Sequence, residues 1–298
     1  MSTIDRTPRA PTLLQSAMLR IAAIVNPHGV DRRVASEFLK PRRYLTPDSE
    51  VLDLPPPQEG MRVATGDAWV AAWRWGNGPA VLFVHGWEDD HHVFDPMIAQ
   101  LIAAGHSVIA FDLPAHGCSG GRRMSLPAAA QAVADVAEAL GPVHAVVGHS
   151  FGGAAATLAV SWGLKVERVV TVATPISVAR MLDLVVERLG LSRARRAGIE
   201  RELVRRVGVP LAAVELEAVA PRLVAPRLVV PGLVVHSRDD RMVPFLAAVR
   251  LQRAWPGAKL FAVEGLGHRR VLSDSAVIAR LADFLGAQAV ETRFAASA

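Results

Sequence analysis

The sequence predicts an α/β protein built on a doubly wound, mostly parallel sheet of about eight strands, with a helical insertion. Three observations lead to this fold class. From residue 80 onward, strand-like and helix-like segments alternate, which is the pattern of a parallel sheet with helices on both faces. The run Ala80–Val84 is apolar throughout, as is typical of a strand buried on both sides. Between Pro175 and Pro231 the alternation stops and the sequence favours helices alone.

Residues 1–58 differ from the rest of the chain and are expected to form a helical extension followed by a linker. Apolar residues recur at helical spacing over 12–25, and Asn26-Pro27-His28-Gly29 is expected to end that helix. A second short helix is expected over 34–39, and Pro55-Pro56-Pro57 is typical of a linker. We expect the extension to pack on the core. A membrane-touching or dimerising arm is the alternative.

The remaining elements follow in order from hydrophobic periodicity and turn residues. The expected strands are 61–65, 69–75, 80–84, 107–111, 143–147, 168–172, 232–236 and 259–263, the first two forming a hairpin turned by Gly66-Asp67. The expected core helices are 96–104, 127–140, one after Ser150, 245–253 and 274–285, and the insertion helices are 178–189, 194–207 and 211–219. These elements predict a core over 59–174 and 232–290, a helical lid over 175–231 and a tail over 291–298, because so long an insertion is usually a lid or a second layer.

Composition excludes several classes of protein. Of the 298 residues, 51% are apolar, which excludes a disordered chain. The net charge of +5 comes from scattered basic residues without interleaved aromatics, so we expect no nucleic-acid partner. Cys118 is the single cysteine, which rules out an intrachain disulfide. The apolar stretch 13–25 is too short to span a bilayer and no signal-peptide cleavage site follows it. The expectation is a soluble cytoplasmic protein without stable membrane insertion, of unspecified oligomeric state.

The most informative motif is the pentapeptide Gly148-His149-Ser150-Phe151-Gly152. It lies between an apolar strand-like run and an alanine-rich helix-like run, which is the strand–turn–helix setting of a nucleophile elbow. Its glycines suit a turn too tight for side chains beside the serine. The five-residue pattern alone is weak, and a glycine-rich turn without chemistry is the alternative. The residues around the motif therefore decide its meaning.

A serine hydroxyl needs a base within hydrogen-bond reach and a carboxylate that orients that base. In an open α/β sheet such residues lie beyond the carboxyl ends of strands. Asp239 and Asp240 follow the expected strand 232–236, and His268 follows the expected strand 259–263. The chain therefore carries serine, acid and histidine in that order, each at the appropriate end of a strand.

Residues from about 61 to 285 resemble the α/β-hydrolase family. Four motifs carry the resemblance: His85-Gly86-Trp87, the stretch 111–119 (Phe-Asp-Leu-Pro-Ala-His-Gly-Cys-Ser), the elbow at Ser150, and the pair Asp240-Arg241-Met242-Val243-Pro244 and Gly265-Leu266-Gly267-His268. Each motif alone is weak, but four in register are specific.

This resemblance implies Ser150 as nucleophile, His268 as general base and acid, and Asp240 as the orienting carboxylate. Asp240 is preferred over Asp239 because it directly precedes the Arg-Met-Val-Pro run. The backbone N–H groups of Phe151 and Trp87 are the expected oxyanion donors. The side chains of Trp87, Phe151 and Met242 are the expected pocket walls, the alternative for Trp87 being a rim aromatic without substrate contact.

Other residues with possible chemistry receive structural interpretations. The cluster Glu88-Asp89-Asp90-His91-His92 could suggest metal ligands, but adjacent histidines suit a single metal poorly, so we expect a solvated loop and no metal. His85 and His116 are interpreted as structural hydrogen-bonding residues, and Asp112 precedes the serine, which is the wrong order for the acid. The insertion's many arginines are expected to form a solvated helical face, the alternative being reception of an acidic substrate.

The functional expectation is a serine hydrolase that cleaves a carboxylic ester or a related small acyl compound through an acyl-enzyme. No cofactor is expected, since the sequence contains neither a dinucleotide-binding fingerprint nor a P-loop. An acyltransferase or thioesterase with the same three residues is one alternative. A non-catalytic binding protein on the same fold is the alternative from another class.

Overall fold

The computed structural model describes residues 13–47, 52, 54–225 and 228–286, so the expected tail 291–298 lies outside the described part. The strands of the main sheet are β1 (Glu59–Thr65), β2 (Ala68–Trp75), β3 (Ala80–Val84), β4 (Ser107–Phe111), β5 (Val143–His149), β6 (Arg168–Val172), β9 (Gly232–Ser237) and β10 (Lys259–Val263). The helices are α1 (Leu13–Val25), α2 (Pro27–Phe38), α3 (Asp95–Ala103), α4 (Leu126–Leu140), α5 (Phe151–Ser161), α6 (Val178–Arg188), α7 (Arg193–Val207), α8 (Leu216–Val219), α9 (Leu246–Ala254) and α10 (Ser275–Gly286).

The expected eight-stranded, mostly parallel sheet is confirmed. Its strand order is β1-β2-β4-β3-β5-β6-β9-β10. The two outer pairs, β1 with β2 and β2 with β4, are antiparallel, and every later pair is parallel. Strand β5 is thus a central strand with neighbours β3 and β6. The loops after these three parallel strands leave the sheet at the same edge, where functional residues of such sheets gather.

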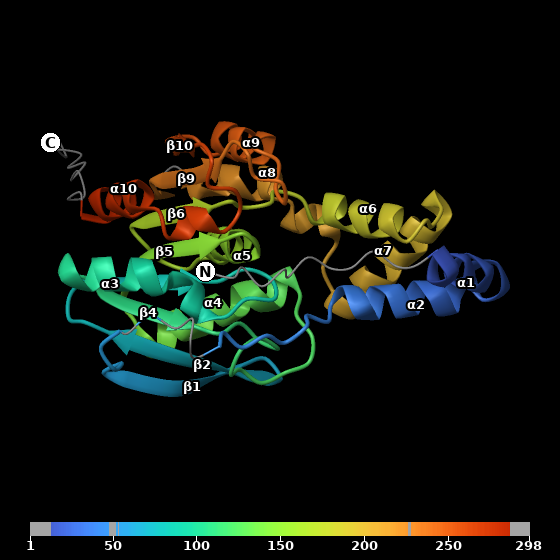
Figure 1. The fold of residues 1–298 in the computed structure, drawn as a ribbon, viewed down its shortest axis with the longest axis horizontal. Helices are drawn as coiled ribbons and strands as arrows, with labels where there is room; N and C mark the ends of the chain where they lie inside the picture. Colours follow the sequence, from blue (N-terminus) through green and yellow to red (C-terminus); the bar gives the residue numbers. More distant parts are fainter. Residues whose placement is uncertain (1–12, 48–51, 53, 226–227, 287–298) are drawn as a thin grey trace, which may run out of the picture. The chain divides into compact units, whose positions relative to one another are not determined.

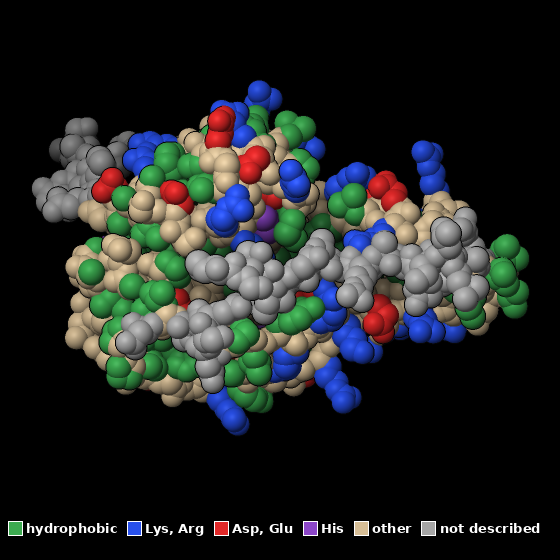
Figure 2. Space-filling model, in the orientation of Figure 1, with side chains coloured by type: hydrophobic (Ala, Val, Ile, Leu, Met, Phe, Trp, Pro, Cys, Tyr) green, Lys and Arg blue, Asp and Glu red, His purple; other side chains and the backbone are tan. Residues whose placement is uncertain are grey.

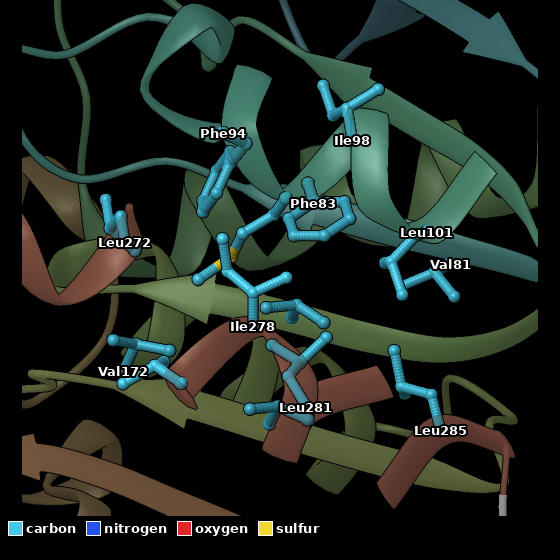
Figure 3. Packing of buried hydrophobic residues seen from close by; sticks show 14 of the residues in the cluster. Val81, Phe83, Phe94, Ile98, Leu101, Val172, Leu272, Ile278, Leu281 and Leu285 are labelled. Atoms are coloured by element: carbon cyan, nitrogen blue, oxygen red, sulfur yellow. The ribbon is translucent and has the colours of Figure 1, made fainter. Parts of the chain in front are cut away.

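Alternate residues of the strands build the core (Figure 3). Val81 and Phe83 of β3 lie in one buried cluster with Phe94, which directly precedes α3, with Ile98 of α3 and with Leu281 of α10. Because strand side chains alternate between faces, this cluster covers one side of the sheet. Helices α4 and α5 pack against each other on the other side (Figure 1). The central strand is therefore buried on both faces, as the apolar runs predicted.

The N-terminal helices and the insertion form one compact unit, made of the described residues up to Lys40 together with Ser177–Glu215. The second unit is made of the described residues of Pro41–Ile176 and of those from Leu216 to Gly286. This division differs from the expected one, which treated residues 1–58 and 175–231 as separate parts. Its physical basis is a shared apolar cluster, to which α2, α6 and α7 contribute Val34, Leu182 and Ile199. That the insertion acts as a lid stays a prediction.

Within this first unit, two of the insertion's arginines are less solvated than expected. Arg195 contacts the buried Asp31 of α2 at 2.9 Å, and Arg196 contacts Asp183 at 2.8 Å. Part of the basic charge is therefore neutralised inside the unit and joins α7 to its neighbours.

Two local expectations are corrected. Helix α2 begins at Pro27, whereas the sequence suggested 34–39. Asn26 is its N-cap and accepts a hydrogen bond from the Gly29 N–H, and proline is well suited to the first helical position. The segment 175–231 was expected to lack strands, but Val224–Ala225 and Leu228–Val229 pair as a short antiparallel hairpin outside the main sheet.

On the face shown in Figure 2, the described Lys and Arg side chains are scattered among acidic and hydrophobic ones. No helix in the described part of the chain has both the length and the apolar character needed to cross a membrane.

Candidate active site

The elbow around Ser150 has the geometry that the motif predicts. Ser150 lies between the end of β5 and the start of α5, with φ 51° and ψ −123°. This conformation with a positive φ is rare for a residue with a side chain and marks a strained turn. A Cβ on Gly148 would lie 2.4 Å from the Gly153 Cα, and one on Gly152 would lie 2.1 Å from the Val84 carbonyl oxygen. Only glycine fits at both positions, because backbone approaches backbone there.

Asp240 and His268 are joined at the same edge of the sheet. His268 Nδ1 lies 2.7 Å from Asp240 Oδ2, and the Asp240 carboxylate is fully buried. Its other oxygen, Oδ1, accepts the backbone N–H groups of Met242 at 2.8 Å and Val243 at 2.9 Å. Burial acts to raise the pKa of Asp240, but hydrogen bonds from His236 and His268 outweigh it and leave the pKa below its ordinary value. Asp240 is therefore an ionised, fully hydrogen-bonded carboxylate.

Asp239 has different surroundings. Its side chain is exposed and accepts hydrogen bonds from the Ser237 hydroxyl and, at 3.3 Å, from the Gly267 N–H. Of the two adjacent acids, Asp240 is the one that contacts the imidazole of His268.

The elbow and the histidine loop are linked through His149. His149 Nε2 lies 2.9 Å from the carbonyl oxygen of His268, and the two imidazole rings are 4.8 Å apart. Within the described residues, the Ser150 hydroxyl takes part in no hydrogen bond, so its contact with the His268 imidazole stays a prediction. Hydrogen bonds between nucleophile and base are often long before substrate binds. The structure thus brings His268 next to the elbow and pairs it with Asp240.

The predicted oxyanion donors lie on adjoining segments. Phe151 is the first residue of α5, where backbone N–H groups lack helical acceptors and the helix dipole favours negative charge. The Trp87 ring meets the Phe151 ring edge to face at a centroid distance of 5.3 Å. The structure therefore brings these two residues together. Met242 is different, since its side chain is 59% exposed, and its place in a substrate pocket stays a prediction.

The expectation of a solvated loop at 88–92 is wrong. Asp89, Asp90 and His91 are all buried. Asp90 accepts hydrogen bonds from the N–H and the hydroxyl of Thr46 at 2.6 and 2.7 Å, and the His91 ring stacks on Trp73 at 3.9 Å. The hydrogen bonds of Asp90 and the stacking of His91 hold the loop against neighbouring segments. Across the described residues, no group of three His, Cys, Asp or Glu side chains could hold a metal ion.

Asp112, at the end of β4, organises this same region. Its carboxylate accepts the N–H of His91 at 2.9 Å and the N–H of Cys118 at 2.7 Å, and it lies 2.9 Å from His91 Nδ1. Burial acts to raise the pKa of Asp112. The contacts with His91 and the Cys118 N–H act in the opposite direction and outweigh burial, so the pKa falls from 3.8 to about 2. His85 Nε2 accepts the Leu113 N–H at 2.9 Å, as expected of a structural histidine. Asp112 therefore has a structural role.

We expect Asp112→Asn to destabilise the protein in a pH-dependent way. The folded pKa of about 2 lies below the ordinary value of 3.8, so the carboxylate contributes about 2 kcal/mol above roughly pH 4, and this is lost as the pH falls toward 2. Urea unfolding at pH 7 should show this difference in the free energy of unfolding, and the difference should shrink below pH 4, because asparagine resembles the protonated acid. The exposed turn residue Asp67 provides the control variant Asp67→Asn. An equal difference at pH 7 and pH 3 contradicts the interpretation.

Three residues of this site escaped sequence reasoning, namely His149, Asp89 and Arg269. Arg269 Nη1 lies 2.6 Å from Asp89 Oδ1, and Asp89 is buried on the loop that carries Trp87. Each of the three lies within two residues of a predicted site residue, which is the signal that could have found them. Nothing in the sequence pairs position 89 with position 269.

Comparison with known proteins gives a consistent result. Residues 81–281 match the model of the alpha/beta hydrolase family. The chain is 34% identical over 142 residues to "Esterase Rv0045c" of Mycobacterium tuberculosis, covering 45% of this chain and 46% of that protein. It is 38% identical over 99 residues to the "Magnesium-chelatase 30 kDa subunit" of Rhodobacter capsulatus, covering 32% of this chain and 34% of that protein. The matches thus span less than half the length of either relative.

Among solved structures, the esterase EaEST from Exiguobacterium antarcticum has the same fold, with a TM-score of 0.61, 16% identity, and coverage of 76% of this chain and 99% of that chain.

Proposed function

Because this chain belongs to the alpha/beta hydrolase family, we propose that it is a serine hydrolase that cleaves carboxylic esters through an acyl-enzyme. Ser150 is the nucleophile, His268 the general base and acid, and Asp240 the carboxylate that orients the base. The observation that carries the proposal is the 2.7 Å contact between His268 Nδ1 and the buried Asp240 carboxylate, next to an elbow with a positive φ at Ser150. The esterases among the similar proteins support the same reaction class.

The reaction follows from the roles of these groups. Asp240 accepts the hydrogen on His268 Nδ1, which leaves Nε2 free to take the proton of Ser150 as its Oγ attacks the ester carbonyl carbon. The negative charge that forms on the carbonyl oxygen is stabilised by the N–H groups of Phe151 and Trp87. The C–O bond to the leaving alcohol then breaks, and His268 returns the proton to that oxygen. Water, deprotonated by His268, attacks the acyl-enzyme and releases the acid and free Ser150.

Two alternatives use the same geometry. Transfer of the acyl group to an acceptor other than water, or attack on a thioester, requires no different residue, so an acyltransferase or thioesterase is a close variant. A non-catalytic protein is the alternative from another class, since the fold alone does not prove catalysis and one similar protein is named as a magnesium-chelatase subunit.

Covalent labelling tests the proposal directly. A fluorophosphonate probe should phosphonylate the Ser150 oxygen with release of fluoride, and mass spectrometry of the peptides should place the adduct on Ser150. Turnover of a panel of p-nitrophenyl esters and the matching acyl thioesters then separates esterase from thioesterase activity. Folded protein that stays unlabelled, or that carries the label on another residue, contradicts the proposed function.

A further inference from the structure

Two polar contacts tie the loop of the base to the other two loops of the site. The imidazole of His149, inside the elbow, contacts the backbone carbonyl of His268 at 2.9 Å. The guanidinium of Arg269, the next residue, contacts the Asp89 carboxylate at 2.6 Å. Asp89 belongs to the loop of Trp87, and its N–H donates to the Gly86 carbonyl at 3.3 Å. The backbone on both sides of the His268–Arg269 peptide is therefore held by side chains from neighbouring segments.

The hydrogen-bond chemistry fixes the tautomer of His149. A carbonyl oxygen only accepts hydrogen bonds, so Nε2 of His149 carries the hydrogen and donates it to His268. The Nδ1 atom is then an unprotonated nitrogen, and among the residues that the structure describes it is buried without a hydrogen-bond partner, 4.0 Å from Asp89 Oδ2. Burying an acceptor nitrogen without a partner costs free energy. The arrangement leaves Nδ1 unpaired while it keeps the hydrogen bond from Nε2 to the His268 carbonyl.

His149 also has to remain neutral. Its ring is completely buried, which lowers its pKa, and the nearby titratable groups are His268, Arg269, Asp240 and Asp89. The His268 ring lies 4.8 Å away and becomes a cation when it takes the serine proton. A second positive charge at that distance would oppose this step, whereas a neutral imidazole does not. His149 can therefore hold the base without disturbing its charge.

We propose that His149 and the Asp89–Arg269 pair are positioning residues, which hold His268 in register with the elbow and with the loop that supplies the Trp87 N–H. This inference rests on the proposed function, because it assigns these residues a task only if His268 is the base. A displacement of about 1 Å can reduce a rate about 100-fold. Loss of either contact should therefore lower kcat far more than it changes KM.

The two amide substitutions of His149 separate hydrogen bonding from mere packing. The side-chain nitrogen of glutamine lies where Nε2 of histidine lies, so His149→Gln retains a donor toward the His268 carbonyl. The nitrogen of asparagine lies where Nδ1 lies, so His149→Asn loses that donor. We expect kcat for a p-nitrophenyl ester to fall about 10- to 100-fold in H149N with KM changed less than about threefold, and to recover most of its value in H149Q.

The ion pair is tested by a double-mutant cycle. Asp89→Asn and Arg269→Gln each break the pair, and the double variant should be no slower than the slower single variant. Arg253→Gln, at an exposed position of α9, is the matched control and should retain the wild-type kcat. Additive losses in kcat overturn the role of the pair.

A readout without catalysis keeps this proposal separate from the proposed function. The hydrogen on His268 Nδ1, held by Asp240, should give a downfield proton resonance in ¹⁵N-histidine NMR spectra. We expect this resonance in the wild type and in H149Q, and its broadening or loss in H149N. If the wild type fails to react with a fluorophosphonate but shows this pattern, the proposed function is wrong and the positioning contact stands. An unchanged resonance and an unchanged kcat in H149N overturn the positioning role.

Discussion

Replacing Ser150 with alanine should reduce the turnover of p-nitrophenyl acetate by about 10⁴- to 10⁶-fold, because it removes the oxygen that forms the acyl-enzyme. The remaining rate would come from the oxyanion donors and from substrate binding alone. The fold should persist, since alanine retains the Cβ of serine and the Ser150 hydroxyl makes no hydrogen bond within the described part of the structure. Steady-state kinetics with purified protein, together with a thermal unfolding curve, measures both effects.

The control is Ser275→Ala, which makes the same chemical change at an exposed position at the start of α10. It should retain wild-type kcat, KM and Tm. Ester turnover that persists in the Ser150 variant at more than about a tenth of the wild-type rate contradicts the nucleophile assignment. A large drop in Tm instead assigns a structural task to the hydroxyl.

The central sheet and its elbow could be predicted because their signals are local. An unbroken apolar run such as Ala80–Val84 requires burial on both faces, and all five of its residues are buried in the core. The glycines at 148 and 152 fit the same logic, since each lies where a Cβ would overlap a backbone atom. Each of these inferences uses only neighbours in sequence, and the parallel topology then follows from the alternation of strands and helices.

The grouping of the N-terminal helices with the insertion could not be predicted in this way. Val34 and Ile199 belong to one apolar cluster although 165 positions separate them. Periodicity shows that a helix has an apolar face but does not identify the helix that covers it. The same limit explains the wrong expectation for residues 88–92. Asp90 is buried against Thr46 and His91 against Trp73, and a run of charged residues is usually solvated when no such partner is known.

In the candidate site, too, local sequence signals predict the residue types, whereas the contacts between distant residues come from the structure. The order of serine, acid and histidine placed each residue at the end of a strand, but two adjacent acids competed for one task. The motif register favours Asp240, and the structure supplies the contact itself, because Asp240 meets His268 Nδ1 at 2.7 Å while Asp239 contacts Ser237 and Gly267. The contact of His149 with the His268 carbonyl also could not be predicted from the sequence. It depends on how two loops 119 positions apart approach each other.

Asp240→Asn should lower kcat by roughly 10⁴-fold while leaving KM nearly unchanged. The argument depends on which way the new amide must face. Its oxygen has to take the place of Oδ1, which accepts the N–H groups of Met242 and Val243. The NH₂ group then replaces Oδ2 and donates to Nδ1 of His268, so the hydrogen of the imidazole moves to Nε2. In that tautomer Nε2 cannot accept the proton of Ser150, and the base is lost although every heavy atom stays in place.

Asp239→Asn is the matched control, because it makes the same change one residue earlier on an exposed side chain. We expect its kcat to stay within about tenfold of the wild type, in line with the small effects typical of exposed polar residues. Steady-state kinetics of both variants, with the histidine tautomer read from ¹⁵N chemical shifts, measures the two consequences separately. A large loss in D239N with little loss in D240N reverses the assignment of the acid. Equal and small losses in both would mean that no carboxylate orients His268, and the buried pair at 2.7 Å would then be structural.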